Sequence, residues 1–588
     1  MDAALPLRVW APVVDGLDLV LEPGGEHALE AVGDGWFLGP LLAPGIRYRL
    51  RVHGGPADGR TITDPGAHSL PDGVFGPGQT VDHDSFWWTD AGWDGGRGAD
   101  RRRASIYELH VGTFTALGNF DGAVARLGHL ADLGVTHLEL LPCASFMGNR
   151  GWGYDSVMWW APHHAYGGVA GMKRFVDAAH GHGLAVLLDV VYNHLGPEGD
   201  TTWALWPIKN PRHQTPWGDA INLDGEHSGG VRRLILDNAL GWLRRYHLDG
   251  LRLDAVHALV DHSPVHLLTE LSTAVDELAD ELGRPLWLTA ESEHRTPEEV
   301  LPRAAGGQGL HASWADDLHH SIHTVLTGES ASYYAPYGSP QQVAATLLDP
   351  YTGRSPGSAG EAPGDRFVVC TQNHDQVGNR ARGERLHHLV GAEGAMAAAA
   401  LVICSPQVPL LWMGEEWAAS TPWPFFANPR DRDLARAIRA GRRREFAEFG
   451  WAPEDIPDPV DPATFESAVL RWSEVSGDEQ ATTLAFYRRL LALLATHPDL
   501  GAGGPPTDAE ARASDGGTVV LRRGRVLVVA HLRPEAAEHE VGGGWSVLAA
   551  TPSARLDGTV VRFPGAGALV LEVALPGEAS DPSGAVSQ

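Results

Sequence analysis

Acidic side chains follow apolar, strand-like runs at four places in the chain. Asp189 ends LAVLLD, Asp254 ends GLRLD, Glu291 ends PLWLTAE and Asp375 follows FVVCTQNH. Parallel-barrel enzymes hold their reactive groups at the C-terminal ends of the strands. Two carboxyl groups in different protonation states can hydrolyse a glycosidic bond, one attacking and the other protonating the leaving oxygen. The four acids therefore predict a single site with hydrolytic chemistry.

Asp254 and Glu291 are the predicted reacting pair. Arg252 lies two residues before Asp254, so both point the same way from a strand, and the cation should lower the pKa of Asp254. Glu291 follows a strongly apolar strand, where desolvation should raise its pKa. Asp375 is the predicted third acid, which stabilises positive charge on the sugar ring. His374 beside it is placed to hydrogen-bond sugar hydroxyls.

Several neighbouring side chains fit a structural role as well as a functional one. Asp189 directly follows LAVLL and fits a role in organising Arg252. Trp152 and Tyr154, in GWGYD, are flanked by glycines, which leaves little local packing and favours a sugar-stacking platform. Trp217, in TPWGDAIN, fits packing and sugar stacking equally well.

The 29 histidines do not form a recognisable metal motif. H-E-x-x-H and paired-cysteine patterns are missing from the sequence, and His180 and His182 fit a helix end, where they can meet terminal carbonyls. We predict no metal and no cofactor. A Gly-rich phosphate loop after a strand is also missing, and the one G-x-S-x-G match, GRSPG at 353–357, does not follow a strand-like run, which argues against kinases, dehydrogenases and esterases.

Composition indicates a large globular protein. A chain of 588 residues with 43% hydrophobic residues suggests two to four domains, one of them with a large core. The formal net charge of −29 argues against nucleic acid or an anionic membrane as partner. Cys143, Cys370 and Cys404 lie in apolar stretches, which predicts buried thiols in a reducing compartment. The opening MDAALPLRVWAP has no basic n-region, so we predict a cytoplasmic protein.

The rhythm of apolar runs divides the chain into regions. Short alternating runs over 1–95 predict an N-terminal β-sandwich, and strands over 510–575 predict a C-terminal β domain followed by a disordered tail at 576–588. Between them, 105–497 reads as an α/β domain, a (β/α)₈ barrel. Its eight apolar runs begin near Ile106, Val135, Leu184, Leu251, Leu286, Leu310, Phe367 and Pro409. An irregular excursion at about 195–230, after the third strand, should roof one side of the site.

The segments DVVYNH, GLRLDAVHA, LTAESE and QNHDQVGN resemble the four signature regions of the α-amylase superfamily of glycoside hydrolases, over roughly 105–420. The resemblance implies that Asp254 is the nucleophile, Glu291 the acid/base and Asp375 the transition-state stabiliser. By the same resemblance, the contacts to the reacting sugar are Arg252, His194 and His374, with Tyr154 as the stacking aromatic.

Further segments, including VTHLELLPCASFMGNRGWGYDSV and WADDLHHSIHTVLTGE, resemble one branch of that superfamily, which cuts the α-1,4 bond next to a trehalose end and releases trehalose. The resemblance implies an α-glucan substrate with a trehalose end, and functional pairing with a maltooligosyltrehalose synthase. It adds a set of substrate-binding residues: His257, Asp316, Asp317, His319, His320, Gln376, Asn379 and Glu415.

Two alternatives use the same sequence features. A glycogen branching enzyme or another α-amylase-type glucanase would have the same three acids, and sequence spacing does not exclude transfer to a sugar hydroxyl. A non-catalytic glucan-binding protein would keep the barrel without turnover, but the intact Asp254, Glu291 and Asp375 argue against it. A retaining mechanism predicts that the carboxyls of Asp254 and Glu291 lie about 5 to 5.5 Å apart.

Overall fold

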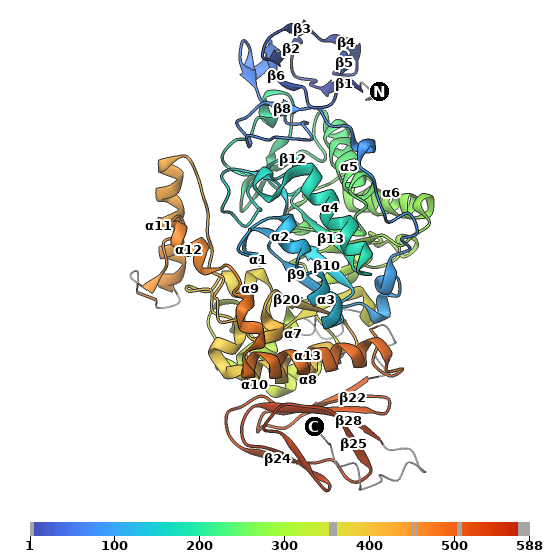
Figure 1. The fold of residues 1–588 in the computed structure, drawn as a ribbon, viewed down its shortest axis with the longest axis vertical. Helices are drawn as coiled ribbons and strands as arrows, with labels where there is room; N and C mark the ends of the chain where they lie inside the picture. Colours follow the sequence, from blue (N-terminus) through green and yellow to red (C-terminus); the bar gives the residue numbers. More distant parts are fainter. Residues whose placement is uncertain (1–4, 352–361, 449–450, 453–454, 503–508, 574–588) are drawn as a thin grey trace.

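The structure is a computed structural model that describes residues 5–351, 362–448, 451–452, 455–502 and 509–573. Figure 1 shows the N-terminal strands at one end, the barrel in the middle and the C-terminal strands at the other end. Helices α11 (Arg432–Glu448) and α12 (Pro462–Ser467) project from one side of the barrel (Figure 1). The predicted tail at 576–588 lies outside the described residues.

Eight parallel strands close into a barrel in sequence order, with the first strand beside the last. They are β9 (Ile106–Leu109), β10 (His137–Leu140), β13 (Ala185–Val190), β16 (Gly250–Leu253), β17 (Trp287–Ala290), β18 (Ala312–Trp314), β19 (Phe367–Cys370) and β20 (Val408–Trp412). All eight predicted strands are present, so the predicted barrel is confirmed. The register sets Glu139 beside Glu108 and Asp189 beside Arg252, which brings ionisable side chains together inside an otherwise apolar barrel.

Helices connect the barrel strands and pack around them. They are α1 (Val111–Phe114), α2 (Phe120–Val124), α3 (Leu127–Leu133), α4 (Gly168–Gly181), α5 (Ser228–Arg245), α6 (Leu267–Leu282), α7 (Asp317–Thr327), α8 (Pro340–Leu348), α9 (His374–Gly378), α10 (Leu386–Ile403) and α13 (Asp478–Thr496). The longer ones, such as α4 and α6, bury one apolar face. In α5, Leu236 and Leu240 are only half-buried, and the buried face includes Ile235, Ala239 and Trp242.

Helix α10 is long and apolar enough to cross a membrane by length and composition, and it alone meets that test among the described residues. Its position explains its composition, because it packs against α13 and against β23 (Val526–His531) and β28 (Gly567–Val573) of the C-terminal domain. The stretch from Ala397 to Ile403 is buried. This is the environment of a core helix between two layers.

The N-terminal strands form two antiparallel sheets. One contains β1 (Leu5–Trp10), β5 (Trp36–Leu42) and β4 (Glu30–Gly33); the other contains β3 (Glu26–Ala28), β2 (Gly16–Glu22), β6 (Arg47–His53) and β7 (Thr61–Ile62), with β8 (Gly78–Gln79) paired to β6. Alternate residues of β6, namely Tyr48, Leu50 and Val52, are buried, as expected for strands with one face on a core.

The C-terminal strands also form two antiparallel sheets. The larger contains β21 (Ala509–Ala513), β22 (Thr518–Arg523), β23, β28 and β25 (Trp545–Ala550); the smaller contains β24 (Ala537–Glu540), β27 (Val560–Phe563) and β26 (Arg555–Asp557). All three cysteines of the chain are buried and free, as their apolar surroundings predict.

Two hairpins extend the loops at the mouth of the barrel. The sequence did not indicate the first, β11 (Ala144–Phe146) with β12 (Ser156–Pro162), which carries Tyr154 in its connection. The second, β14 (Lys209–Thr215) with β15 (Gly218–Ile221), lies in the predicted excursion. The excursion is anchored to the N-terminal domain, since Trp206 Nε1 donates to the Trp10 carbonyl at 2.8 Å and Thr201 Oγ1 to the Thr63 carbonyl at 2.9 Å.

Candidate active site

One buried guanidinium joins three of the four predicted acids. Arg252, in β16, donates from Nη1 to Asp189 Oδ2 at 2.7 Å and to Asp254 Oδ1 at 2.9 Å. Its Nη2 forms an ion pair with Glu291 Oε2 at 2.9 Å. The guanidinium also lies 4.4 Å from the centre of the Trp314 ring, a cation–π contact. Asp254 and Glu291 therefore flank a single positive charge, while Asp189 holds that charge in place.

The backbone after β16 is strained at Ala255. Its φ of 40° lies in the left-handed region, which costs a non-glycine residue on the order of 1 kcal/mol. The conformation directs the Ala255 amide to Glu291 Oε2 at 2.9 Å, and the Val256 amide donates to the Glu291 carbonyl at 2.9 Å. The strain thus fixes the position of Glu291 relative to the strand that ends in Asp254.

The protonation of the pair differs from the sequence prediction. Burial and the nearby charge of Glu291 raise the pKa of Asp254 well above its usual range, despite Arg252. Burial also acts to raise the pKa of Glu291, but Arg252 and the Ala255 amide outweigh it and lower that pKa. The expectation was the reverse, because it assigned Arg252 to Asp254 alone.

His374, at the start of α9, is a buried cation. Its Nδ1 donates to Glu108 Oε1 at 2.6 Å, and its backbone amide donates to Glu108 Oε2 at 3.0 Å. Burial would lower the pKa of His374, but Asp375 and Glu108 raise it to about 10. Tyr154 stacks on the imidazole, with ring centroids 5.1 Å apart, and its hydroxyl donates to Asp189 Oδ2 at 2.6 Å. Tyr154 therefore links His374 to the Arg252 cluster.

Asp375 is the most accessible of the three predicted catalytic acids, with 37% of its side chain exposed. Burial raises its pKa, while His374 acts in the opposite direction. Asn379 Nδ2 donates to Asp375 Oδ1 at 3.1 Å, and Arg442 of α11 donates to Asn379 Oδ1 at 3.2 Å. The helix that projects from the barrel thus supports the third acid through Asn379.

The comparisons with known proteins identify the family of the chain. A family model described as the alpha amylase catalytic domain matches residues 81–204. A malto-oligosyltrehalose trehalohydrolase from Arthrobacter ramosus is 44% identical, over 96% of this chain and 99% of that protein. The chain belongs to the malto-oligosyltrehalose trehalohydrolase family. A crystal structure described as an alpha amylase from Salmonella typhimurium has a TM-score of 0.86 and 36% identity, covering 97% of this chain and 98% of that one.

The branching-enzyme alternative has a weaker match than the trehalohydrolase family. The 1,4-alpha-glucan branching enzyme of Bordetella bronchiseptica is 28% identical over 76% of this chain and 63% of its own length. The trehalohydrolase relative matches over 96% of this chain and 99% of its own length.

The predicted substrate block at 316–320 is mostly buried in this member of the trehalohydrolase family. Asp317 is enclosed, and its Oδ1 is paired with Arg295 and accepts a hydrogen bond from the Tyr337 hydroxyl. His319 Nδ1 donates to the Thr371 carbonyl at 2.6 Å, and its Nε2 lies 3.1 Å from the Tyr334 hydroxyl. His320 is buried against Tyr333 and Tyr337. These three residues shape the wall rather than line its surface.

Asp316 differs from the rest of the block. It is only partly buried, and burial together with the charge of Glu291 raises its pKa to about 7. The charges of Glu291 and Asp375 both act on it, so it belongs to the same electrostatic cluster as the acids. His257 also lies beside this cluster, with its Nδ1 accepting from the Glu293 amide at 3.3 Å.

Two further predicted substrate contacts, Trp152 and Glu415, are packed closely against other parts of the chain. Trp152 is 7% exposed and stacks on Trp423 at 4.5 Å, and it approaches Gly378 so closely that a Cβ there would lie 2.1 Å from the indole. Its flanking glycines suggested little packing, but the partners come from distant segments. Glu415 is 4% exposed, and its Oε2 accepts from the Trp412 amide at 3.0 Å and from Gln372 at 3.2 Å. Both residues support the site from beneath.

His194 lies under the excursion. Trp217 stacks on it, with ring centroids 4.8 Å apart and planes at 7°, and Asn193 Nδ2 donates to Asp254 Oδ2 at 3.1 Å. Burial lowers the pKa of His194 to about 4, so the imidazole is neutral. Gln376 is 9% exposed, with its backbone amide bonded to Asn373 Oδ1 at 3.0 Å. Sequence reasoning missed two residues of the site, Asn193 and Glu108. Glu108 follows Tyr107 on a strand, so the alternation of side chains along the strand could have marked it as facing inward.

Proposed function

We propose that this protein is a retaining glycoside hydrolase that cleaves the α-1,4-glucosidic bond next to the trehalose end of maltooligosyltrehalose, releasing trehalose. The observation that carries the proposal is the pair of carboxyls, Asp254 and Glu291, on two arms of one buried guanidinium. The near full-length match to a protein named for that activity supports the choice of substrate.

In the first step, a carboxylate oxygen of Asp254 attacks the anomeric carbon of the glucose next to trehalose. The bond from that carbon to the trehalose oxygen breaks, and Glu291 protonates the oxygen as it leaves. Asp375, the more exposed acid, stabilises the positive charge that develops on the ring. In the second step Glu291 accepts a proton from water, which attacks the same carbon and frees Asp254.

The electrostatics of the substrate-free pair have a consequence for this mechanism. Burial raises the pKa of Asp254, and Arg252 and the Ala255 amide lower that of Glu291, whereas attack requires an ionised Asp254 and a protonated Glu291. A glycosidic oxygen placed beside Glu291 favours its protonated form, because only that form can donate a hydrogen bond to it. Bound substrate therefore shifts the pair toward the protonation state that the reaction requires.

Selectivity for trehalose falls on the wall formed by Asp316 and the residues behind it. A polar group shaped to a sugar hydroxyl rejects a ligand that lacks that hydroxyl, because the group is then buried without a partner. Asp316 is the partly exposed member of the wall and lies in the field of Glu291. We assign it the contact to the departing trehalose, and we further propose a cytoplasmic location and pairing with the synthase that makes the substrate.

Product analysis tests the proposal. The protein is incubated separately with maltooligosyltrehalose and with plain maltooligosaccharides of matched length, and the products are separated by chromatography. Fast trehalose release with slow attack on the plain glucan is the expected result. New branch points without trehalose would make the protein a branching enzyme instead, and binding without turnover would make it a glucan-binding protein.

A further inference from the structure

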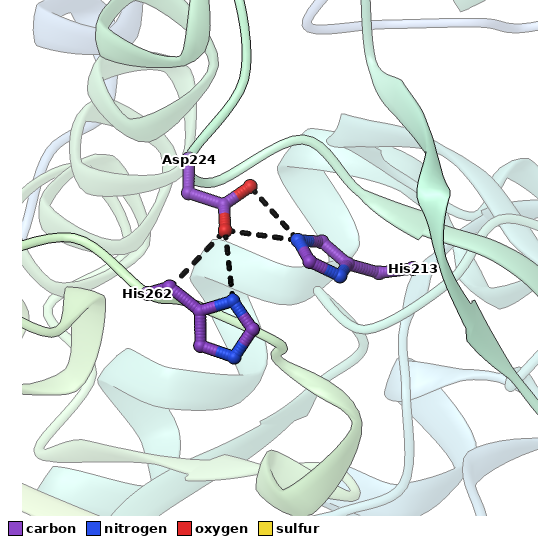
Figure 2. Close-up of side chains that lie close together, drawn as sticks. All are labelled: His213, Asp224 and His262. Carbon is purple, nitrogen blue, oxygen red and sulfur yellow. Dashed lines mark hydrogen bonds and ion pairs between the residues drawn. The ribbon is translucent and has the colours of Figure 1, made fainter.

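Three side chains outside the active site converge at the base of the β14–β15 hairpin. They are His213 in β14, Asp224 just after β15 and His262 in the loop after β16. One nitrogen or oxygen of each lies within 4.8 Å of the others. Figure 2 shows both imidazoles turned toward the carboxylate, with His213 Nε2 2.9 Å and His262 Nδ1 3.4 Å from Asp224 Oδ2.

The backbone presents these side chains before any ligand arrives. Strand register passes from Asn210 opposite Ala220 directly to Gln214 opposite Asp219, so residues 211–213 bulge out of the hairpin. Bulges of this kind redirect side chains, here that of His213. The loop that carries His262 is held by Asp261, which accepts from the Leu267 amide at 2.7 Å and pairs with Arg232 at 2.5 Å.

We propose that His213, Asp224 and His262 form a binding site for a divalent transition metal of the Zn²⁺ class, which clips the hairpin to the loop after β16. Two imidazoles and one carboxylate are donors that Zn²⁺ accepts, whereas Ca²⁺ and Mg²⁺ require oxygen ligands. Because 72% of the His262 side chain is exposed, water has access to complete a tetrahedral set.

The surroundings of Asp224 match those of a metal-ligating carboxylate. Asn210 Nδ2 donates to Asp224 Oδ1 at 2.7 Å, a second contact that orients the acid. The competing cation is Arg212, whose Nη2 lies 3.7 Å from Asp224 Oδ1 and donates to the Asp224 carbonyl at 3.3 Å; its side chain is 65% exposed.

The position of the clip connects it to the active site. The loop after β16 runs from Asp254 to His262, and the tip of the hairpin carries Trp217, which stacks on His194. An ion at the base of the hairpin would restrain it at that end, while the stacking of Trp217 on His194 holds its tip. The site stands on its own ligand geometry and does not depend on which glucan the enzyme cleaves.

The first test is calorimetric titration of the chelator-treated full-length protein with Zn²⁺ alone. We expect saturable binding of one ion per chain, weakened at least about tenfold in His262→Ala and Asp224→Asn. His227→Ala, which removes an exposed histidine of the same excursion, is the matched control and should bind as the wild type does. Equal affinity in wild type and His262→Ala, or no saturable binding at micromolar Zn²⁺, would overturn the proposal.

A second measurement reports on the clip itself. Amide hydrogen exchange of residues 209–221 should slow when Zn²⁺ is added to the wild type and remain unchanged when it is added to His262→Ala. Since His262 is exposed, its loss leaves the fold intact, which the unchanged exchange of the barrel strands verifies. Slowing of the hairpin to the same degree in both proteins would show that the ion binds elsewhere.

Discussion

The acids at the ends of β16 and β17 and the block at the start of α7 both lie at the mouth of the barrel, but their polar atoms are used differently. Glu291 keeps 23% of its side chain exposed, and the Ala255 amide and Arg252 both contact its Oε2. His319 has both ring nitrogens engaged by Thr371 and Tyr334. A residue can bind a ligand through hydrogen bonds only when some of its polar atoms have no partner within the protein. Closeness to a site along the sequence does not show which atoms are available.

The largest effect should come from Asp254. Asp254→Ala removes the attacking carboxylate, so we expect kcat on maltooligosyltrehalose to fall on the order of 10⁴-fold or more. The melting temperature should stay near that of the wild type. Burial raises the pKa of the Asp254 carboxyl, so near neutral pH this group already costs free energy on folding. Turnover within tenfold of the wild type would place the nucleophile elsewhere.

Glu108→Gln should give the next largest effect, by changing the charge of His374. Without the carboxylate the pKa of His374 falls from about 10, so kcat/KM should decline with rising pH at a lower pH than in the wild type, with about tenfold lower activity at pH 8. Glu139→Gln is the matched control. Burial raises the pKa of Glu139 well above its usual range, so glutamine mimics its neutral form and the profile should not move.

Comparing Asp316→Asn with Asp317→Asn separates a role in substrate preference from a role in stability within the 316–320 block. Asp316→Asn should remove a titration near pH 7 from the profile of kcat/KM and reduce the preference for the trehalose end, with little change in stability. Asp317→Asn weakens the buried pair with Arg295 and should lower stability by up to about 3 kcal/mol, seen as a lower melting temperature. Identical behaviour of the two variants would remove the distinction drawn between them.

The smallest effect is expected at Glu415. Burial raises its pKa to about 8, above the ordinary value of 4.5, so its contribution to stability is present at low pH and is lost as pH rises through 8. Glu415→Gln lacks this titration. Its melting temperature should therefore gain on the wild type between pH 5 and 9, while kcat/KM changes less than about twofold. A large loss of kcat/KM would restore Glu415 to the substrate surface.

The sequence predicted the barrel and its acids because apolar runs and the acids that follow them are local features. The closed barrel and the starts of its strands agree with that prediction. The shared role of Arg252 was not predictable, since it depends on Glu291 reaching the same guanidinium from the next strand. For the same reason, His213, Asp224 and His262 match no motif: their spacings of 11 and 38 residues become a cluster only after the bulge and loop are in place.

The hydrogen bond from Trp206 to the Trp10 carbonyl limits how modular this protein is. Trp10 also packs so tightly against Gly230 that a Cβ there would lie 2.0 Å from the indole, so the first strand and the start of α5 fit each other without spare room. The excursion that covers His194 therefore has its foundation in another domain. A barrel separated from its N-terminal strands, or joined to those of a relative, would keep the acids. It would lose the contacts with Trp10 that hold the excursion over His194.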